Sequence, residues 1–355
     1  MVLWSLSMIP ADVASCLNSD MKMLRFSFCL SAVSSLNALF FLLVLVKKSL
    51  KSCSKVIQTP DLITILSKQY IESILHKEGL NGSNSMSTPL DLNIMLILNP
   101  EGTNRSRSNL FTRLLGELQY IANATCPDIT YVVNRLASYI ANLSMQHNMA
   151  LKWILRYVSG IQSHSIVYKA QPQHQNLYGY VDTAYSNADD KKLTTGYVFL
   201  VADGAIMWSS KKQISMALSL MEAEYIMLSE SAHEACWLWN LYNKLGLLPK
   251  ELPMLVLGDN KGAIAMTKNP QFHKRSKHIE ICWHWVWDLV QEGTINVESV
   301  WDPEQTADIL IKALPCLKYK KHTEDMGLAP VWGGVLGSNK RDLAIRYDPT
   351  ILGAS

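Results

Sequence analysis

The sequence predicts an α/β fold, in which a mixed sheet with flanking helices follows a smaller and mostly helical region. From Leu177 onward, apolar runs of strand length alternate with amphipathic stretches of helix length. Between residues 61 and 171, apolar residues recur mainly at helical spacing. A composition of 48% hydrophobic and 18% charged residues over 355 residues is typical of a globular protein and allows two domains.

The N-terminal segment, residues 1–60, shows no sustained hydrophobic period, so we expect a divergent segment that is unstructured or an apolar remnant. Within it, Phe26–Val46 is mostly apolar and about long enough to cross a bilayer, and Lys47 and Lys48 follow it. Several serines dilute this stretch, and it begins too late for a signal peptide. We therefore expect no membrane partner, and a membrane-anchored protein is the alternative.

Residues 61–171 are predicted to be mainly helical. Apolar residues at spacings of three and four predict helices over 62–79, 110–120, 129–140 and 149–158. Pro127 marks the start of the third helix. A polar linker over 171–176 places a domain boundary there, so a second domain is expected over 172–328 and a loose glycine-rich tail over 329–355.

The second domain alternates strands and helices. Strands are predicted over 177–182, 195–201, 205–209, 254–257 and 294–300, and helices over 219–245, 263–268, 281–292 and 306–314. Asp203-Gly204 is a strong signal for a two-residue turn, so the second and third strands should form a hairpin. A three-strand meander followed by helix–strand alternation indicates a mixed sheet.

Charge and cysteine content restrict the class of protein. The net charge of +3 does not indicate nucleic-acid binding by itself, but lysines and arginines cluster at 211–212, 274–277 and 318–321. Seven scattered cysteines without a C-x-x-C pair argue against a disulfide framework or a zinc site. They fit a reducing compartment, the cytoplasm or the nucleus.

Four carboxylates stand at predicted element ends. Asp182 and Asp259 follow apolar strands, Glu222 opens a long helix and Asp308 opens a short one. Acidic residues at the ends of buried strands can gather at one sheet edge as ligands for hard cations. Four of them can hold two divalent cations about 4 Å apart, an arrangement suited to displacement at phosphorus. Two Mg²⁺ ions, or Mn²⁺ in their place, are the expected cofactors.

Five ordered motifs carry a resemblance to a known family. They are the hairpin pair Thr-Thr-Gly-Tyr at 194–197 with Trp-Ser-Ser-Lys-Lys-Gln at 208–213, Ser-Leu-Met-Glu-Ala-Glu-Tyr at 219–225, Gly-Asp-Asn at 258–260, Phe-His-Lys-Arg-Ser-Lys-His-Ile at 272–279 and Ala-Asp-Ile-Leu-Ile-Lys-Ala-Leu-Pro at 307–315. With these motifs, the chain from about Leu66 to Leu328 resembles the C-terminal part of the Pol polyprotein of copia-type LTR retrotransposons. That part comprises the end of reverse transcriptase and its ribonuclease H domain.

The resemblance implies a ribonuclease H-like sheet over 172–328, preceded by a reverse-transcriptase thumb/connection remnant over 61–171. It implies a two-metal nuclease that hydrolyses the RNA strand of RNA/DNA hybrids. The implied metal ligands are Asp182, Glu222, Asp259 and Asp308, the implied proton-transfer residue is His278 with His284 as second candidate, and the implied phosphate contacts are Lys211, Lys212, Arg275 and Lys277. The expected partners are the hybrid and a complete retrotransposon Pol, with no dedicated small-molecule ligand.

The departures from the family pattern define the alternative. The family has Asp-Ala-Asp-Trp where this chain has Asp-Thr-Ala-Tyr at 182–185, so one acid is lost. The polymerase turn Tyr-x-Asp-Asp is missing from the sequence, so we expect a truncated protein without polymerase activity. The alternative to an active nuclease is a catalytically silent retroelement relic that at most binds nucleic acid.

Overall fold

The computed structural model describes residues 54–80, 82–94, 96–97, 105–169, 177–185, 193–213, 220–244, 252–268, 277–332 and 335–336. The apolar stretch Phe26–Val46 and the predicted linker at 171–176 lie outside the described residues. In the part of the chain that is described, no helix has the length and apolar character needed to cross a membrane.

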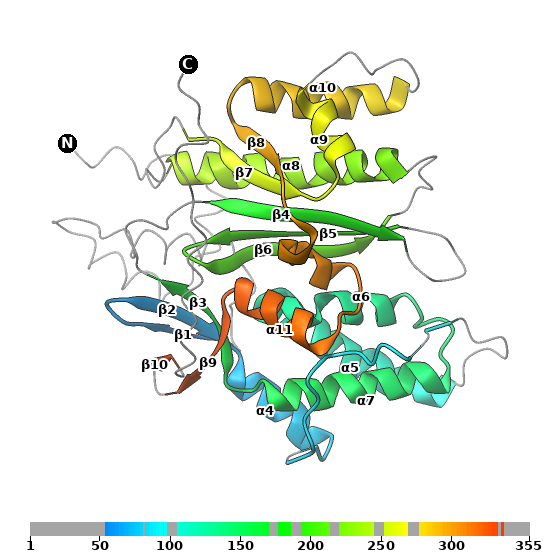
Figure 1. The fold of residues 1–355 in the computed structure, drawn as a ribbon. Coiled ribbons are helices and arrows are strands. Elements are labelled where there is room, and N and C mark those ends of the chain that lie inside the picture. Colours follow the sequence, from blue (N-terminus) through cyan, green and yellow to red (C-terminus); the bar gives the residue numbers. More distant parts are fainter. Residues whose placement is uncertain are drawn as a thin grey trace, which may run out of the picture.

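The larger sheet has five strands and mixed direction. It consists of β4 (Tyr178–Tyr185), β5 (Leu193–Val201), β6 (Gly204–Lys212), β7 (Met254–Gly258) and β8 (Ile295–Ser299), in the order β6-β5-β4-β7-β8. The first three strands are antiparallel neighbours, whereas β7 runs parallel to both β4 and β8. This arrangement confirms the predicted mixed sheet (Figure 1).

The connection between β5 and β6 is a two-residue hairpin turn formed by Ala202 and Asp203. Ala202 and Asp203 both have positive φ, 48° and 63°, as a two-residue type I′ turn requires. Gly204 then begins β6, and a Cβ at this position would lie 2.6 Å from the ring of Tyr168 and 2.8 Å from the Val167 carbonyl oxygen. The glycine therefore allows the hairpin to pack directly against a strand of the smaller sheet.

Three helices cover one face of the larger sheet: α8 (Leu220–Lys244), α9 (Lys261–Lys268) and α10 (Lys277–Gln291) (Figure 1). Apolar residues of α8 at helical spacing, including Leu228, Ala232 and Ala235, are fully or almost fully buried, and α8 contacts β4 and β5. On the outer side, the ring of His233 in α8 stacks on Trp285 of α10 at 3.8 Å.

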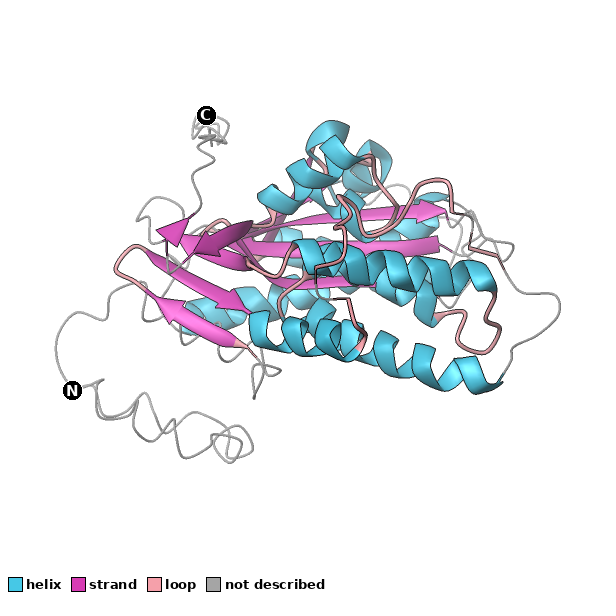
Figure 2. Cartoon of the chain, turned by 90° about the horizontal axis from the view of Figure 1, so that it is seen from below, coloured by secondary structure: helices cyan, strands magenta, loops and turns pink. Residues whose placement is uncertain are grey.

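The opposite face is covered by helices of the preceding region. They are α4 (Lys68–Lys77), α5 (Arg105–Ala124), α6 (Thr130–Ala137) and α7 (Met145–Gly160), with the short 3₁₀ turn η1 (Pro127–Ile129) before α6. Viewed from below, helices lie in front of the strands and run in roughly the same direction (Figure 2). Two hydrogen bonds join α5 and α6 to β6. The Trp208 indole donates to the Ala122 carbonyl of α5 at 2.9 Å, and the Asn134 side-chain amide of α6 donates to the Ser210 carbonyl at 2.6 Å.

One predicted helix is partly wrong. Residues 62–66 form strand β2 (Leu62–Leu66), and the helix begins only at Lys68. The run Leu-Ile-Thr-Ile-Leu is rich in β-branched residues, and its apolar character suits a buried strand as well as a helix. Pairing on both sides decides the outcome, since β2 lies between β1 (Lys55–Gln58) and β3 (His164–Lys169).

The predicted loose tail is also corrected in part. Residues 328–332 and 335–336 form β9 (Leu328–Trp332) and β10 (Val335–Leu336), and β9 pairs with β3. Without β9, one edge of β3 would expose unpaired backbone groups. The smaller sheet thus has the order β1-β2-β3-β9-β10, and β1 itself belongs to the segment expected to be divergent. Its buried residues and those of the larger sheet form one continuous core.

The segment after β8 is not the predicted α-helix. Residues 302–304 and 306–310 form two short 3₁₀ turns, η3 (Asp302–Glu304) and η4 (Thr306–Leu310). Pro315 restricts only Leu314, so the early end of η4 reflects its close packing against β4 and β5. A further helix, α11 (Cys316–Asp325), begins directly after Pro315.

Candidate functional site

Asp182 is brought to the centre of the site by strand β4. It lies within the strand, is only 4% exposed, and faces Gly196 of β5 in the antiparallel register. A Cβ at Gly196 would lie 2.7 Å from Ile311 Cγ2 and 2.8 Å from Leu310 Cβ. The missing side chain therefore lets η4 lie directly against the strand beside Asp182.

Asp308 of η4 is completely buried, and its carboxyl group lies close enough to that of Asp182 for the two groups to influence each other's pKa. The pKa of Asp182 is raised well above its usual range by burial, by the Asp308 carboxyl group and by the negative charge of Asp259. Burial alone would also raise the pKa of Asp308, but the interaction with Asp182 and the ammonium groups of Lys312 and Lys318 hold it below its usual value. The pKa values of the two acids therefore move in opposite directions, upward for Asp182 and downward for Asp308.

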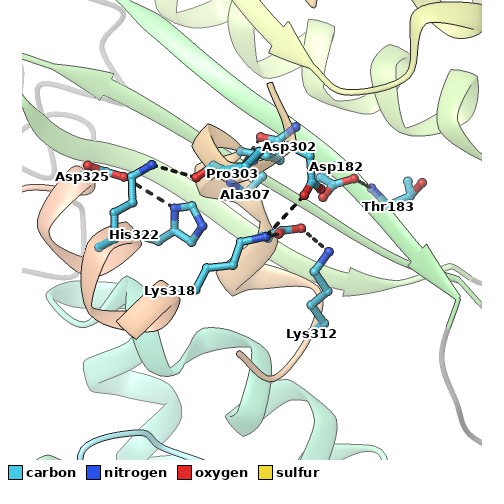
Figure 3. A network of polar contacts seen from close by, with 12 residues as sticks. Asp182, Thr183, Asp302, Pro303, Ala307, Lys312, Lys318, His322 and Asp325 are labelled. Atoms are coloured by element: carbon cyan, nitrogen blue, oxygen red, sulfur yellow. Dashed lines mark hydrogen bonds and ion pairs between the residues drawn. The ribbon is translucent and has the colours of Figure 1, made fainter. Parts of the chain in front are cut away.

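Two lysines neutralise Asp308. Lys318 Nζ donates a hydrogen bond to Asp308 Oδ2 at 2.5 Å. Lys312 Nζ lies 2.5 Å from Asp308 Oδ1, as an ion pair without hydrogen-bond geometry. Figure 3 shows both lysine side chains reaching the polar network around Asp182. On its other side, Asp182 Oδ1 accepts a hydrogen bond from the Thr183 backbone N–H at 2.7 Å.

Asp259 follows β7 at the same end of the sheet, where the Val300 N–H donates to the Gly258 carbonyl at 2.9 Å. It is more exposed than the other two acids. Its pKa is raised by partial burial and then by the charge of Asp308, and its own charge raises the pKa of Asp182. Asp182, Asp259 and Asp308 therefore share one electrostatic environment.

For several of the remaining predicted site residues, the structure describes only the backbone or nothing at all. Lys211 and Lys212 end strand β6, and Lys211 lies one position beyond Ser210, which pairs with Gly196. Glu222 lies in the first turn of α8, and Lys277 and His278 begin α10, but their side chains lie outside the described residues, as does all of Arg275. His284 is exposed on α10.

Sequence reasoning missed three charged residues of this site. Lys312 stands in the quoted motif at 307–315, so its spacing from Asp308 was a usable signal. Lys318 belongs to the basic cluster at 318–321, which indicated phosphate contacts rather than pairing with Asp308, and Asp302 gave no signal. Both reach the site through the packing of α11 and η3.

The donor set fits a hard divalent cation in its chemistry. Asp182, Asp259 and Asp308 offer only oxygen donors, as Mg²⁺ prefers, and their mutual repulsion is what a cation would relieve. As they stand, no three His, Cys, Asp or Glu side chains form a metal-holding group within the described ranges, which exclude the side chain of Glu222. In this structure, lysine ammonium groups supply the compensating positive charge.

The comparisons identify relatives by sequence. No family model matches the chain. The retrovirus-related Pol polyprotein from transposon TNT 1-94 of Nicotiana tabacum is 33% identical over 267 residues, which cover 74% of this chain and 20% of that protein. The one from transposon RE2 of Arabidopsis thaliana is 32% identical over 283 residues, 79% of this chain and 19% of that protein. The chain spans about a fifth of the length of these curated relatives.

Among solved structures, the N-terminal ribonuclease H domain of rv2228c from Mycobacterium tuberculosis is 17% identical, and the match covers 42% of this chain and 96% of that chain. Its TM-score of 0.29 is too low to support an argument, so the fold rests on the strand order described above. The sequence matches, together with the mixed sheet that the family motifs predicted, place this chain in the family of retrovirus-related Pol polyproteins from copia-type transposons.

Proposed function

We propose that the chain carries a ribonuclease H-type nuclease that hydrolyses the RNA strand of RNA/DNA hybrids with two Mg²⁺ ions. The observation that carries this proposal is the contact between two buried carboxylates, Asp182 and Asp308, beside Asp259. Two acids buried in contact destabilise a fold unless a cation or proton compensates them. Such perturbed carboxylates are typical of functional sites.

In the proposed mechanism, the carboxylates of Asp182, Asp259 and Asp308, with Glu222, would hold the two ions. Bound Mg²⁺ would lower the pKa of an attacking water and stabilise the leaving oxygen. Lys211 and Lys212, at the same end of the sheet, would bind backbone phosphates of the hybrid and fix its register. Selectivity for the RNA strand would come from contacts to the 2′-hydroxyl. His278 remains the proposed proton-transfer residue.

The pairing of Asp308 with two lysines favours one second candidate, a silent relic that binds nucleic acid without cutting it. In that case, the ammonium groups would be permanent replacements for the cations. Both candidates predict binding to the hybrid, and only the first predicts cleavage.

The test uses the full chain and an end-labelled RNA/DNA hybrid, with Mg²⁺ or Mn²⁺. We expect cleavage of the RNA strand only, reduced at least about 100-fold in Asp259→Asn, because the lost carboxylate cannot be replaced by a neutral amide. Asp61→Asn, an exposed acid at the β1–β2 turn, is the matched control and should cut normally. Binding without cleavage would refute the nuclease and support the relic.

A further inference from the structure

We propose that Lys318 is a positioning residue, a tethered cation that holds Asp308 and must leave it when a divalent cation binds. This inference rests on the proposed function, since it concerns the same carboxylates. Through Lys318, helix α11 would take part in the replacement of the lysine ammonium group by a metal ion at Asp308.

Lys318 pairs with Asp308 Oδ2, one of the atoms proposed to bind the metal ion. Lys318 Nζ lies 2.5 Å from Asp308 Oδ2, at hydrogen-bond distance, and the Asp308 side chain is only 1% exposed. The ammonium group occupies one lone pair of Asp308 Oδ2 and places a positive charge beside the position that a metal ion would take. Lys318 therefore competes with a divalent cation for Asp308.

Lys318 has an acceptor to move to. Its Nζ already lies 3.9 Å from Oδ2 of Asp302, whose side chain is 68% exposed, and Lys318 itself is 29% exposed. A small rotation toward Asp302 keeps the ammonium group paired and in contact with water. The exchange therefore leaves no unpaired charge buried.

Helix α11 can stay in place during this exchange. Lys321 Nζ donates to the Pro303 carbonyl at 2.7 Å, and the buried Tyr319 hydroxyl donates to the Asp128 carbonyl at 3.1 Å. These contacts fix α11 on either side of Lys318. Loss of the Lys318 contact should therefore change the site without detaching the helix.

The experiment measures metal affinity rather than cleavage. In the full chain, Mn²⁺ binding is followed by calorimetry and by electron paramagnetic resonance for wild type, Lys318→Met and Lys318→Arg. We expect Lys318→Met to bind Mn²⁺ about tenfold tighter, because a competing charge is removed. Lys318→Arg should bind like wild type, because it keeps the charge.

Lys320→Met is the matched control. Lys320 is on the same helix, is 65% exposed and lies 3.9 Å from Glu324, away from the acids of the site. Its replacement should leave Mn²⁺ affinity unchanged. Equal or weaker Mn²⁺ affinity in a folded Lys318→Met variant would overturn the inference while leaving the nuclease proposal intact. Failure of every variant to bind Mn²⁺ would overturn both proposals.

A second measurement needs no folded Lys318→Met variant. In wild-type protein labelled with ¹³C at lysine Cε, the Lys318 resonance is assigned by its loss in Lys318→Arg. Saturation with Mg²⁺ should shift the Lys318 signal and leave that of Lys320 in place. A Lys318 signal that stays unchanged while Mg²⁺ binds would show that Lys318 does not leave Asp308.

Discussion

At the scale of single residues, the site buries acidic groups at a cost in stability. Asp182 and Asp308 are buried near each other, and Lys312 and Lys318 neutralise only Asp308. A structural role alone would be served better by an amide or an apolar side chain at position 182. Retention of an acid there is therefore best explained by binding of a cation.

Asp182→Asn should stabilise the protein while abolishing cleavage. The amide can still accept from the Thr183 N–H, and it removes the cost of burying an ionisable group. Because the folded protein raises the pKa of Asp182, that cost grows as the pH rises, and at pH 7 we expect a gain of about 2 kcal/mol. Urea unfolding at pH 7 measures it, with Asp61→Asn as control, and a clear loss of stability would contradict the explanation.

At the scale of elements, the site depends on how closely η4 approaches β5. Gly196 allows this close approach because it has no side chain, and Leu310 and Ile311 fill the space where a Cβ would stand. The glycine thus determines whether Asp308 can reach Asp182.

Gly196→Ala should therefore be destabilising. Its Cβ would lie 2.7 Å from Ile311 Cγ2, so η4 must shift, and we expect a loss of about 1–3 kcal/mol of unfolding free energy. Gly116→Ala is the matched control, because no atom lies within 4 Å of its Cβ and the residue is within α5. That change should stabilise the protein by about 0.5–1 kcal/mol. Equal effects of the two variants in chemical unfolding would disprove the packing argument.

At the scale of the whole molecule, the C-terminal part is built into the region that precedes the larger sheet. Strand β9 completes the sheet of β1, β2 and β3, and Tyr319 of α11 reaches Asp128 of η1. The Asp128 side chain is buried and accepts a hydrogen bond from the Tyr157 hydroxyl at 2.5 Å. Segments far apart in the sequence, α7 and α11, therefore meet at Asp128.

This junction should make stability depend on pH. Burial raises the pKa of Asp128 to about 6, although the Tyr157 hydrogen bond opposes it. Because the folded pKa exceeds the unfolded value, the stabilising contribution is complete below about pH 4 and is lost as the pH rises through 6. Relative to Asp128→Asn, wild type should lose up to about 3 kcal/mol between pH 4 and pH 7. Parallel unfolding curves for the two proteins across that range would refute this role.

Most elements could be predicted because their signals are local. The β5–β6 hairpin, the period of α8 and the apolar strand β7 each reflect short-range geometry, and the structure confirms them. The two turn residues of the hairpin are Ala202 and Asp203, one position earlier than the Asp203-Gly204 signal predicted. Residues 62–66 and 306–314 were mispredicted, because β2 depends on its strand partners and η4 on its packing against β4 and β5. The contribution of β9 was missed for the same reason as that of β2.

The sequence by itself determined the mixed sheet, the order of its main elements and the family, since periodicity, turn residues and ordered motifs are written in the chain. It also named Asp182, Asp259 and Asp308 as candidate ligands. Only the tertiary structure decided that the buried carboxyl groups of Asp182 and Asp308 shift each other's pKa and that Lys318 pairs with Asp308. These facts depend on distances between residues far apart in the chain, which are set by the packing of η4 and α11 against the sheet and on each other.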